Sequence, residues 1–276
     1  MIYPNFDPVA LSIGSLSIHW YGISYMVAFL AGWWLCRVRA KQLVGWNQQA
    51  IDDLVFYVVL GVVLGGRLGY ILFYSFDDWV ADPLRLFRVW EGGMSFHGGL
   101  LGVLIAMGLL ARKQQRSYFE VTDFIAPIIP VGLFSGRIGN FINGELWGGP
   151  TEMAWGMQLE CERFYHVCAD KLALPPGTMM TPALHPSQLY EALLEGLVLF
   201  VILWVLAARR PPLMVISAAF LLLYSSFRFA VEFVRMPDAH LGYLWADWLT
   251  MGQLLSIPMF IAGLLILWRA LNSKNT

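Results

Sequence analysis

The stretch LVFYVVLGVVLGGRLGYILFYS, residues 54–75, contains a single charged side chain, Arg67. A helix that crosses a membrane needs about 20 mostly apolar residues, so this stretch predicts such a helix. Gly61, Gly65 and Gly69 recur at intervals of four, which predicts close packing against a neighbouring helix rather than a functional site. The expected fold is therefore built from helices within a membrane.

The composition agrees with this interpretation. The chain has 276 residues, of which 58% are hydrophobic and 13% are charged, and its mean hydropathy is +0.60. Globular proteins have about 25% charged residues, so an integral membrane protein is expected. The net charge of −1 gives no basic excess for binding nucleic acid. The N-terminus, MIYPNFDPV, lacks a basic region, and the first apolar segment is expected to remain as an anchor rather than be cleaved.

Seven spans are expected in one domain, 1–276, as an all-α bundle of transmembrane helices. The predicted spans are 19–36, 54–75, 96–111, 121–142, 187–207, 213–234 and 247–268. Basic residues gather in alternate connections, namely Arg37, Arg39, Lys41, Arg112, Lys113, Arg116, Arg209, Arg210, Arg269 and Lys274. The positive-inside rule then places the N-terminus outside and the C-terminus in the cytoplasm.

Two segments on the outer side are expected to be more than simple loops. Residues 79–90 mix aromatic and basic side chains and predict a helix lying in the membrane interface. Residues 149–184 are the one long polar stretch, and we interpret them as a small extracytoplasmic cap between the fourth and fifth spans. Cys161 and Cys168 lie within it. A disulfide between them and two free thiols are about equally compatible with the sequence.

Polar residues within the predicted spans gather in the outer half of the bilayer. They are Tyr21, Arg67, Tyr70, His97, Arg137, Asn140, Gln188, Glu191, Tyr224, Arg228 and Glu232. A transporter or a proton relay needs polar groups through the full depth of the membrane. The distribution instead favours a site that is reached from the outer leaflet.

Simpler structural roles compete with this interpretation. Arg228 and Glu232 are four residues apart on one helix face and are expected to pair. Glu191 can serve only to neutralise an arginine of a neighbouring helix, and Glu145 can brace the loop after the fourth span. His185 precedes Pro186 at a helix start and is as compatible with a structural as with a catalytic role.

The residue types favour a phosphate-containing substrate. Arg67, Arg137 and Arg228 supply planar guanidinium groups that suit phosphate and stay charged when buried. His97 is the natural general base near neutral pH. The chain has no GxSxG or HExxH motif and no Cys/His cluster with metal spacing, so no metal and no cofactor are expected. The nucleophile should therefore arrive on a substrate.

Several motifs resemble those of bacterial prolipoprotein diacylglyceryl transferases, in the family's order and over most of the chain. They are HWYGISY (19–25), GGMSFHGGLLG (92–102), GRIGNFINGELWG (136–148), LHPSQLYEALLEG (184–196), FRFAVEFVRMPDA (227–239) and MGQLLSIP (251–258). The resemblance implies transfer of a diacylglyceryl group from phosphatidylglycerol to the thiol of a lipobox cysteine in a secreted prolipoprotein, with release of glycerol 1-phosphate. It also implies a multi-pass protein of the bacterial cytoplasmic membrane whose active site faces the outer leaflet, among membrane lipids.

Roles for individual residues follow from the motifs and the residue chemistry together. Expected catalytic residues are His97, Arg137, Asn140, Arg228 and Glu232. Expected phosphatidylglycerol contacts are Arg137, Arg228, Tyr21, Arg67, Tyr70, Tyr224, Asn143, Glu145 and Gly148. Expected supporting residues are Glu191, His185, Gln188 and Arg235. A lipid-binding scaffold, a phospholipase that uses water, and a transporter are the competing functions.

Overall fold

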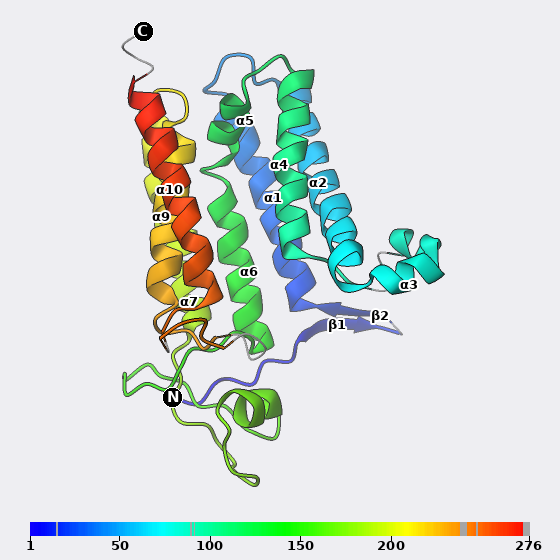
Figure 1. The fold of residues 1–276 in the computed structure, drawn as a ribbon, viewed down its shortest axis with the longest axis vertical. Helices are drawn as coiled ribbons and strands as arrows, with labels where there is room; N and C mark the ends of the chain where they lie inside the picture. Colours follow the sequence, from blue (N-terminus) through cyan, green and yellow to red (C-terminus); the bar gives the residue numbers. More distant parts are fainter. Residues whose placement is uncertain (15, 89, 91, 238–241, 247, 273–276) are drawn as a thin grey trace. The chain divides into compact units, whose positions relative to one another are not determined.

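The computed structural model describes residues 1–14, 16–88, 90, 92–237, 242–246 and 248–272 (Figure 1). It is mostly helical, and the chain divides into two compact units. The larger unit comprises Met1–Gly32 and Ala126–Thr276, and the smaller unit comprises Trp33–Ile125. Four predicted features lie wholly or partly outside the described residues: residue 89 of the predicted interface helix 79–90, the first residue of the seventh predicted span, the last two residues of the 227–239 motif, and Lys274.

Helices α2 (Gln48–Tyr74) and α4 (Phe96–Lys113) run side by side in the smaller unit (Figure 1). Glycines form their contact. A Cβ atom added to Gly61 would lie 2.7 Å from the carbonyl oxygen of Gly102, and one added to Gly69 would lie 2.7 Å from Gly98 Cα. Only residues without a side chain allow the two backbones to approach so closely. The packing role predicted from the glycine spacing is confirmed.

Replacing Gly98 by alanine should therefore lower the free energy of unfolding by about 1–3 kcal/mol, the usual cost of overpacking. The new methyl group would meet the carbonyl oxygen of Gly65 and lie 2.8 Å from Gly69 Cα. Gly99 is the matched control, because a Cβ atom there has its nearest neighbour, the Val62 carbonyl oxygen, at 3.6 Å. Denaturant unfolding in detergent compares the variants, and equal losses for G98A and G99A would contradict this account.

The buried side chain of Arg67 organises the segment between α2 and α4. Its guanidinium group donates five hydrogen bonds to backbone carbonyl oxygens of residues 85–93. Three of these are Nε to Leu86 at 3.2 Å, Nη1 to Gly93 at 3.1 Å and Nη2 to Arg88 at 3.0 Å. This arrangement satisfies the buried guanidinium group and holds the segment against α2.

The predicted helix over 79–90 is wrong as a single element. The chain forms a short helix α3 (Phe76–Ala81) and a 3₁₀ helix η1 (Pro83–Phe87). They are separated at Asp82, because a residue before proline is driven out of the helical conformation, and Asp82 has φ −141°. Leu84, Phe87 and Trp90 remain exposed, which fits an interfacial segment.

The larger unit begins with an antiparallel hairpin that the sequence analysis did not predict. Strand β1 (Val9–Ile13) pairs with β2 (Leu16–His19), and helix α1 (Trp20–Ala40) follows directly. The fourth predicted span is split into α5 (Tyr118–Ile125) and α6 (Ile129–Asn143). The break contains Pro127, which removes a backbone donor and disfavours a helical conformation of the preceding residue.

The remaining helices of the larger unit support the site. Helices α7 (Ser187–Glu191), η4 (Ala192–Val198, a π-helix) and α8 (Leu199–Ala208) follow one another without interruption. Helices α9 (Val215–Val231) and α10 (Met251–Asn272) run side by side (Figure 1). Helix η4 packs closely on α6, since a Cβ atom added to Gly196 would lie 2.6 Å from Phe134 Cβ.

Residues 149–184 are compact and contain the π-helix η3 (His166–Lys171). Their apolar side chains form a buried cluster with Tyr3 and Trp147, comprising Leu159, Phe164, Val167 and Leu184 together with Met236. Cys161 and Cys168 are joined by a disulfide, so the alternative of two free thiols is excluded. Cys36, the remaining cysteine, is free and buried.

Alkylation of the unfolded protein should report this pairing directly. Without reductant, a maleimide reagent is expected to modify one of the three cysteines, namely Cys36. After reduction it should modify all three, with a matching increase in mass. The Cys36→Ser variant is the control and should take up no label before reduction. Three modified thiols without reductant would contradict the disulfide.

Four helices or helical stretches in the described chain are long and apolar enough to cross a membrane. They are Gln48–Tyr74, Phe96–Lys113, Ser187–Ala208 and Met251–Asn272. Helices α5 and α6 add a fifth if together they make one span. The 17 residues of α9 fall short of the usual length, and α1 ends in Arg37 and Arg39. The protein is therefore a mostly helical membrane protein with four or five candidate spans among the described residues, and seven spans stay a prediction.

Candidate active site

Six charged side chains gather inside the larger unit, and we call them the charge cluster. They are Arg137 on α6, Glu191 on α7, Glu195 on η4, Arg228 on α9, and Glu232 and Arg235 just after α9. All six side chains are at most 18% exposed. Buried charges are stable only when paired, so their mutual contacts decide whether this region folds.

Glu191 lies at the centre of the charge cluster and is fully buried. Its Oε2 atom lies 2.6 Å from Arg137 Nε, and its Oε1 atom lies 2.9 Å from Arg228 Nη1. Arg235 Nη1 lies 3.1 Å from the same Oε1 atom. Glu191 therefore neutralises arginines of neighbouring helices, as the simpler interpretation of the sequence predicted, and it joins three of them through one carboxylate.

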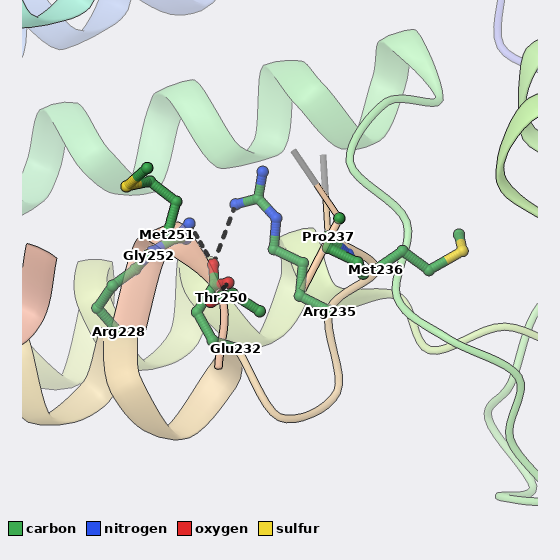
Figure 2. Close-up of a pocket in the computed structure, with 9 residues that line it drawn as sticks. Arg228, Glu232, Arg235, Met236, Pro237, Thr250, Met251 and Gly252 are labelled. Atoms are coloured by element: carbon green, nitrogen blue, oxygen red, sulfur yellow. Dashed lines mark hydrogen bonds and ion pairs between the residues drawn. The ribbon is translucent and has the colours of Figure 1, made fainter. Parts of the chain in front are cut away.

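Glu232 anchors the other side of the cluster. It forms the predicted i,i+4 ion pair with Arg228, and Arg235 Nη1 lies 3.8 Å from its Oε1 atom. Figure 2 shows both guanidinium groups directed at this carboxylate. Thr250, next to the start of α10, donates a hydrogen bond to Glu232 Oε2 at 2.5 Å. Gly252 permits the approach, because a Cβ atom there would lie 2.6 Å from Glu232 Cδ.

Glu195 is the least engaged member of the charge cluster. It is fully buried, and its oxygens lie 3.5 Å from Arg137 Nη2 and 3.7 Å from Arg228 Nη1. Among the described residues neither oxygen accepts a hydrogen bond. Three arginines face three glutamates, so the cluster is formally neutral, and its third carboxylate is held only by longer-range attraction.

A cavity of about 30 Å³ lies beside Arg228, Glu232 and Arg235 and is bordered also by Thr250 and Gly252 (Figure 2). That volume corresponds to about one water molecule. Arg137 is not among the residues that border the cavity. In this structure the guanidinium groups of Arg228 and Arg235 are both paired with carboxylates.

The turn after α6 has a rigid backbone. Gly144 ends the helix in the left-handed conformation, with φ +70°, and the Glu145 amide donates to the Asn140 carbonyl oxygen at 3.0 Å. Asn143 Nδ2 donates to Glu145 Oε1 at 2.8 Å. The buried Trp147 donates its Nε1 hydrogen to the Gly144 carbonyl oxygen at 2.9 Å. Glu145 therefore braces this turn, as the structural interpretation expected.

Gly148 and the HPSQ motif hold the far end of that turn. The Gly148 amide donates to the His185 carbonyl oxygen at 2.9 Å, and a Cβ atom there would lie 2.7 Å from His185 Cβ. Ser187 Oγ donates to the Leu146 carbonyl oxygen at 2.6 Å, and the fully buried Gln188 donates to the carbonyl of Glu145. Burial lowers the pKa of His185, whose Nδ1 atom lies 3.1 Å from the Tyr190 hydroxyl.

Two tyrosines predicted as ligands lie beside these groups. Tyr21 packs on α6, with its Cδ2 atom 3.2 Å from where a Cβ atom of Gly139 would lie, and its hydroxyl is 3.1 Å from that of Tyr25. Tyr224 stacks on Phe220 with ring centroids 5.7 Å apart, and it lies close enough to Glu195 to interact electrostatically. Both belong to the larger unit.

Three predicted site residues belong to the smaller unit. His97 is exposed in the first turn of α4, with its ring centroid 5.6 Å from that of Phe96. Arg67 binds the carbonyl groups of residues 85–93, and its guanidinium lies 5.9 Å from the ring centroid of Tyr70. The structure thus brings Arg137, Arg228, Glu191, Glu232 and Arg235 together, and it holds Arg67 in contacts of its own.

Glu195, Thr250 and Gly252 contribute to the site but were not among the predicted site residues. Glu195 follows Glu191 by four residues, so both lie on one helix face, and that spacing was an available signal. Gly252 lies in the 251–258 motif. Nothing in the sequence alone indicates that Thr250 reaches Glu232, because the two residues are 18 positions apart.

The fold and the site define the class of protein: a mostly helical membrane protein with a buried cluster of arginines and carboxylates. A family model described as prolipoprotein diacylglyceryl transferase matches residues 8–269. The chain belongs to the prolipoprotein diacylglyceryl transferase family.

Individual relatives agree along nearly the whole chain. A phosphatidylglycerol–prolipoprotein diacylglyceryl transferase of Nitratidesulfovibrio vulgaris strain Miyazaki F is 52% identical over 270 residues, covering 98% of this chain and 96% of its own. The enzyme of the same name from Pseudomonas putida is 49% identical over 275 residues, covering 99% and 97%. That of Methylococcus capsulatus is 51% identical over 269 residues, covering 97% and 96%.

Proposed function

We propose that this protein transfers the diacylglyceryl group of phosphatidylglycerol to the cysteine thiol of a prolipoprotein lipobox, the first step of lipoprotein maturation. The thiol sulfur forms a bond to the carbon of the diacylated glycerol that carries the phosphate. The bond between that carbon and its phosphate oxygen breaks, and the phosphate leaves with the second glycerol. The products are a thioether and glycerol 1-phosphate. One observation carries this proposal: in a chain of this family, Arg137 and Arg228, from different helices, meet at one buried carboxylate.

The charge cluster suggests how the lipid binds. An incoming phosphodiester replaces carboxylate oxygens on Arg137 and Arg228, and the guanidinium groups then stabilise the negative charge that grows on the leaving phosphate. Glu195 is the carboxylate that a phosphate would displace most easily from the arginines, since its contacts with Arg137 and Arg228 are long, at 3.5 and 3.7 Å. Glu191 and Glu232 keep the arginines in position. Asn140, Tyr21 and Tyr224 orient the head group.

The thiol requires activation, and His97 is the proposed base. A cysteine thiol with a pKa of about 8.5 is only a few per cent ionised at neutral pH, so a base that accepts its proton accelerates the attack. Histidine chemistry and the place of His97 in the 92–102 motif support this role. Arg67 and Tyr70 are proposed to contact the lipid, as their residue chemistry predicted.

We further propose the membrane arrangement. Seven spans place the N-terminus outside, residues 149–184 as an external cap, the active site toward the outer leaflet and the C-terminus in the cytoplasm of a bacterium. The alternation of basic connections supports this topology. The Cys161–Cys168 disulfide supports an oxidising location for residues 149–184. Both units are proposed to form one transferase domain, since the family match spans both.

The decisive experiment incubates purified full-length protein with phosphatidylglycerol labelled in its diacylglyceryl part, with and without a lipobox peptide. Label on the peptide cysteine is expected, with one glycerol 1-phosphate released for each thioether formed. A peptide in which serine replaces that cysteine is the control. Release of labelled diacylglycerol without peptide would favour a phospholipase, and no turnover would favour a lipid-binding scaffold. Either result would overturn the proposal.

Replacing His97 by glutamine should lower turnover about thirtyfold at pH 7, because the reaction then depends on the small fraction of thiolate present in the peptide. The loss should shrink as the pH rises toward about 8.5, where the thiol ionises without help. A pH profile of kcat for the wild type and for H97Q measures this. Turnover close to wild type with an unchanged profile would remove His97 from the role of base.

A further inference from the structure

A groove lies in the smaller unit, where α1 ends and α2 begins. Its volume is about 420 Å³, and it is bordered by Trp34 and Arg37 on α1, by Lys41, and by Trp46 and Gln48 at the start of α2. None of its lining residues belongs to the charge cluster. The proposed transferase reaction gives this groove no role.

The groove carries two cations that no described carboxylate neutralises. Arg37 donates from Nε and Nη2 to Gln48 Oε1, at 2.9 and 2.6 Å. Lys41 is exposed and forms no ion pair or hydrogen bond with its side chain within the part of the chain that the structure describes. The carboxylate of this network is Asp52, which accepts both its hydrogen bonds from Gln48 Nε2, at 2.9 and 3.0 Å. The neutral amide of Gln48 thus separates Asp52 from Arg37.

Two further features favour an anion at the edge of a lipid bilayer. The α2 helix of 27 residues starts at the groove, where Asn47 caps it by accepting from the Ala50 amide, so its N-terminus adds partial positive charge. Trp34 is 61% exposed, and Arg37 lies over the Trp33 ring at 4.4 Å. Tryptophan side chains favour the level of the lipid head groups.

We propose that this groove binds the phosphodiester head group of an acidic phospholipid, with the phosphate between Arg37 and Lys41. The acyl chains would lie along the exposed apolar side of α1 near Trp34. In the proposed topology this is the cytoplasmic leaflet, opposite to the transferase site. The positive-inside rule explains basic residues near helix ends, but it does not explain a groove that presents two of them beside tryptophan rings and a helix N-terminus.

Photolabelling tests this site on the full-length chain. The protein, freed of lipid in a neutral detergent, is irradiated with a photoreactive phosphatidylglycerol, and the labelled peptides are mapped. Labelling of residues 34–51 is expected, and it should fall about tenfold or more in the variant R37Q/K41Q. The control R112Q/R269Q removes the same charge from helix ends outside the groove and should leave the labelling intact. Equal losses in both variants, or equal labelling by a photoreactive phosphatidylcholine, would overturn the proposal.

Competition separates a lipid from a soluble phosphate compound. Unlabelled phosphatidylglycerol should abolish the labelling of residues 34–51, whereas inorganic phosphate or glycerol phosphate at millimolar concentration should leave it unchanged. Displacement by either soluble compound would overturn the assignment to a lipid. Transferase turnover of R37Q/K41Q at saturating substrate should stay within about twofold of wild type, since neither residue belongs to the charge cluster. Loss of turnover in R37Q/K41Q with labelling retained would contradict a separate site.

Discussion

Replacing Arg137 by glutamine should lower kcat/KM for diacylglyceryl transfer by about three orders of magnitude. Arginines that stabilise the charge of a departing phosphate contribute about 10³-fold or more, and a single lost donor in such a site costs about 10²–10³-fold. Arg137 is the cluster member supplied by α6, and its Nε atom binds Glu191 at 2.6 Å. Without it, one side of the proposed phosphate site is empty.

The Arg137→Lys variant makes the test more specific. Lysine keeps the charge but lacks the planar fork that binds two oxygens at once, so its activity should fall between that of the wild type and R137Q. The exposed Arg209, at the end of α8, gives the control R209Q, which should act like the wild type. Thermal unfolding in detergent checks that each variant is folded. A folded R137Q that retains more than about a tenth of wild-type kcat/KM would refute this role.

Replacing Glu191 by glutamine should destabilise the protein by about 3–5 kcal/mol, the usual cost of removing one partner of a buried ion pair. The change keeps the shape of the side chain but leaves three arginines with two carboxylates. Glu191 is fully buried and lies within 3.1 Å of all three guanidinium groups. The free energy of unfolding, measured with denaturant in detergent, reports the loss.

Two matched variants show whether the loss of stability depends on the position of the carboxylate or only on the removal of a charge. Glu195→Gln removes the same charge from the same cluster, but its contacts of 3.5 and 3.7 Å are longer, so the loss should be smaller. Glu152→Gln, in the exposed part of residues 149–184, should change stability by less than about 0.5 kcal/mol. A loss for E195Q equal to or larger than that for E191Q would contradict the central position of Glu191.

The helices were largely predictable because each is encoded locally. Apolar length marks a membrane helix, and glycines at every fourth position mark a close contact, as the approach of Gly61 to Gly102 confirms. The hairpin Val9–His19 was not predicted, and the interface helix was wrong at Asp82, where Pro83 breaks it. Turn and helix-breaking residues are visible in the sequence, but the hydrophobic pattern dominates a prediction of long helices.

Most residues of the site were predicted from the sequence, but the contacts between them were not. The predicted depth in the membrane grouped Arg137, Glu191 and Arg228, and the structure joins the two arginines through the carboxylate of Glu191. Depth also grouped Arg67 with them, yet Arg67 donates five hydrogen bonds to carbonyl groups of residues 85–93. Residue type alone cannot distinguish an arginine available to a ligand from one committed to the backbone.

By itself, the sequence determined that this is a helical membrane protein, which charged residues lie within its apolar segments and which family its motifs resemble, because hydrophobicity and spacing along one helix are local properties. The tertiary structure alone decided that Arg137, Arg228 and Arg235 share Glu191 and that Thr250 supports Glu232. These contacts join residues that are far apart in the chain. Their existence depends on distances of a few ångströms between side chains, which no pattern within a single helix encodes.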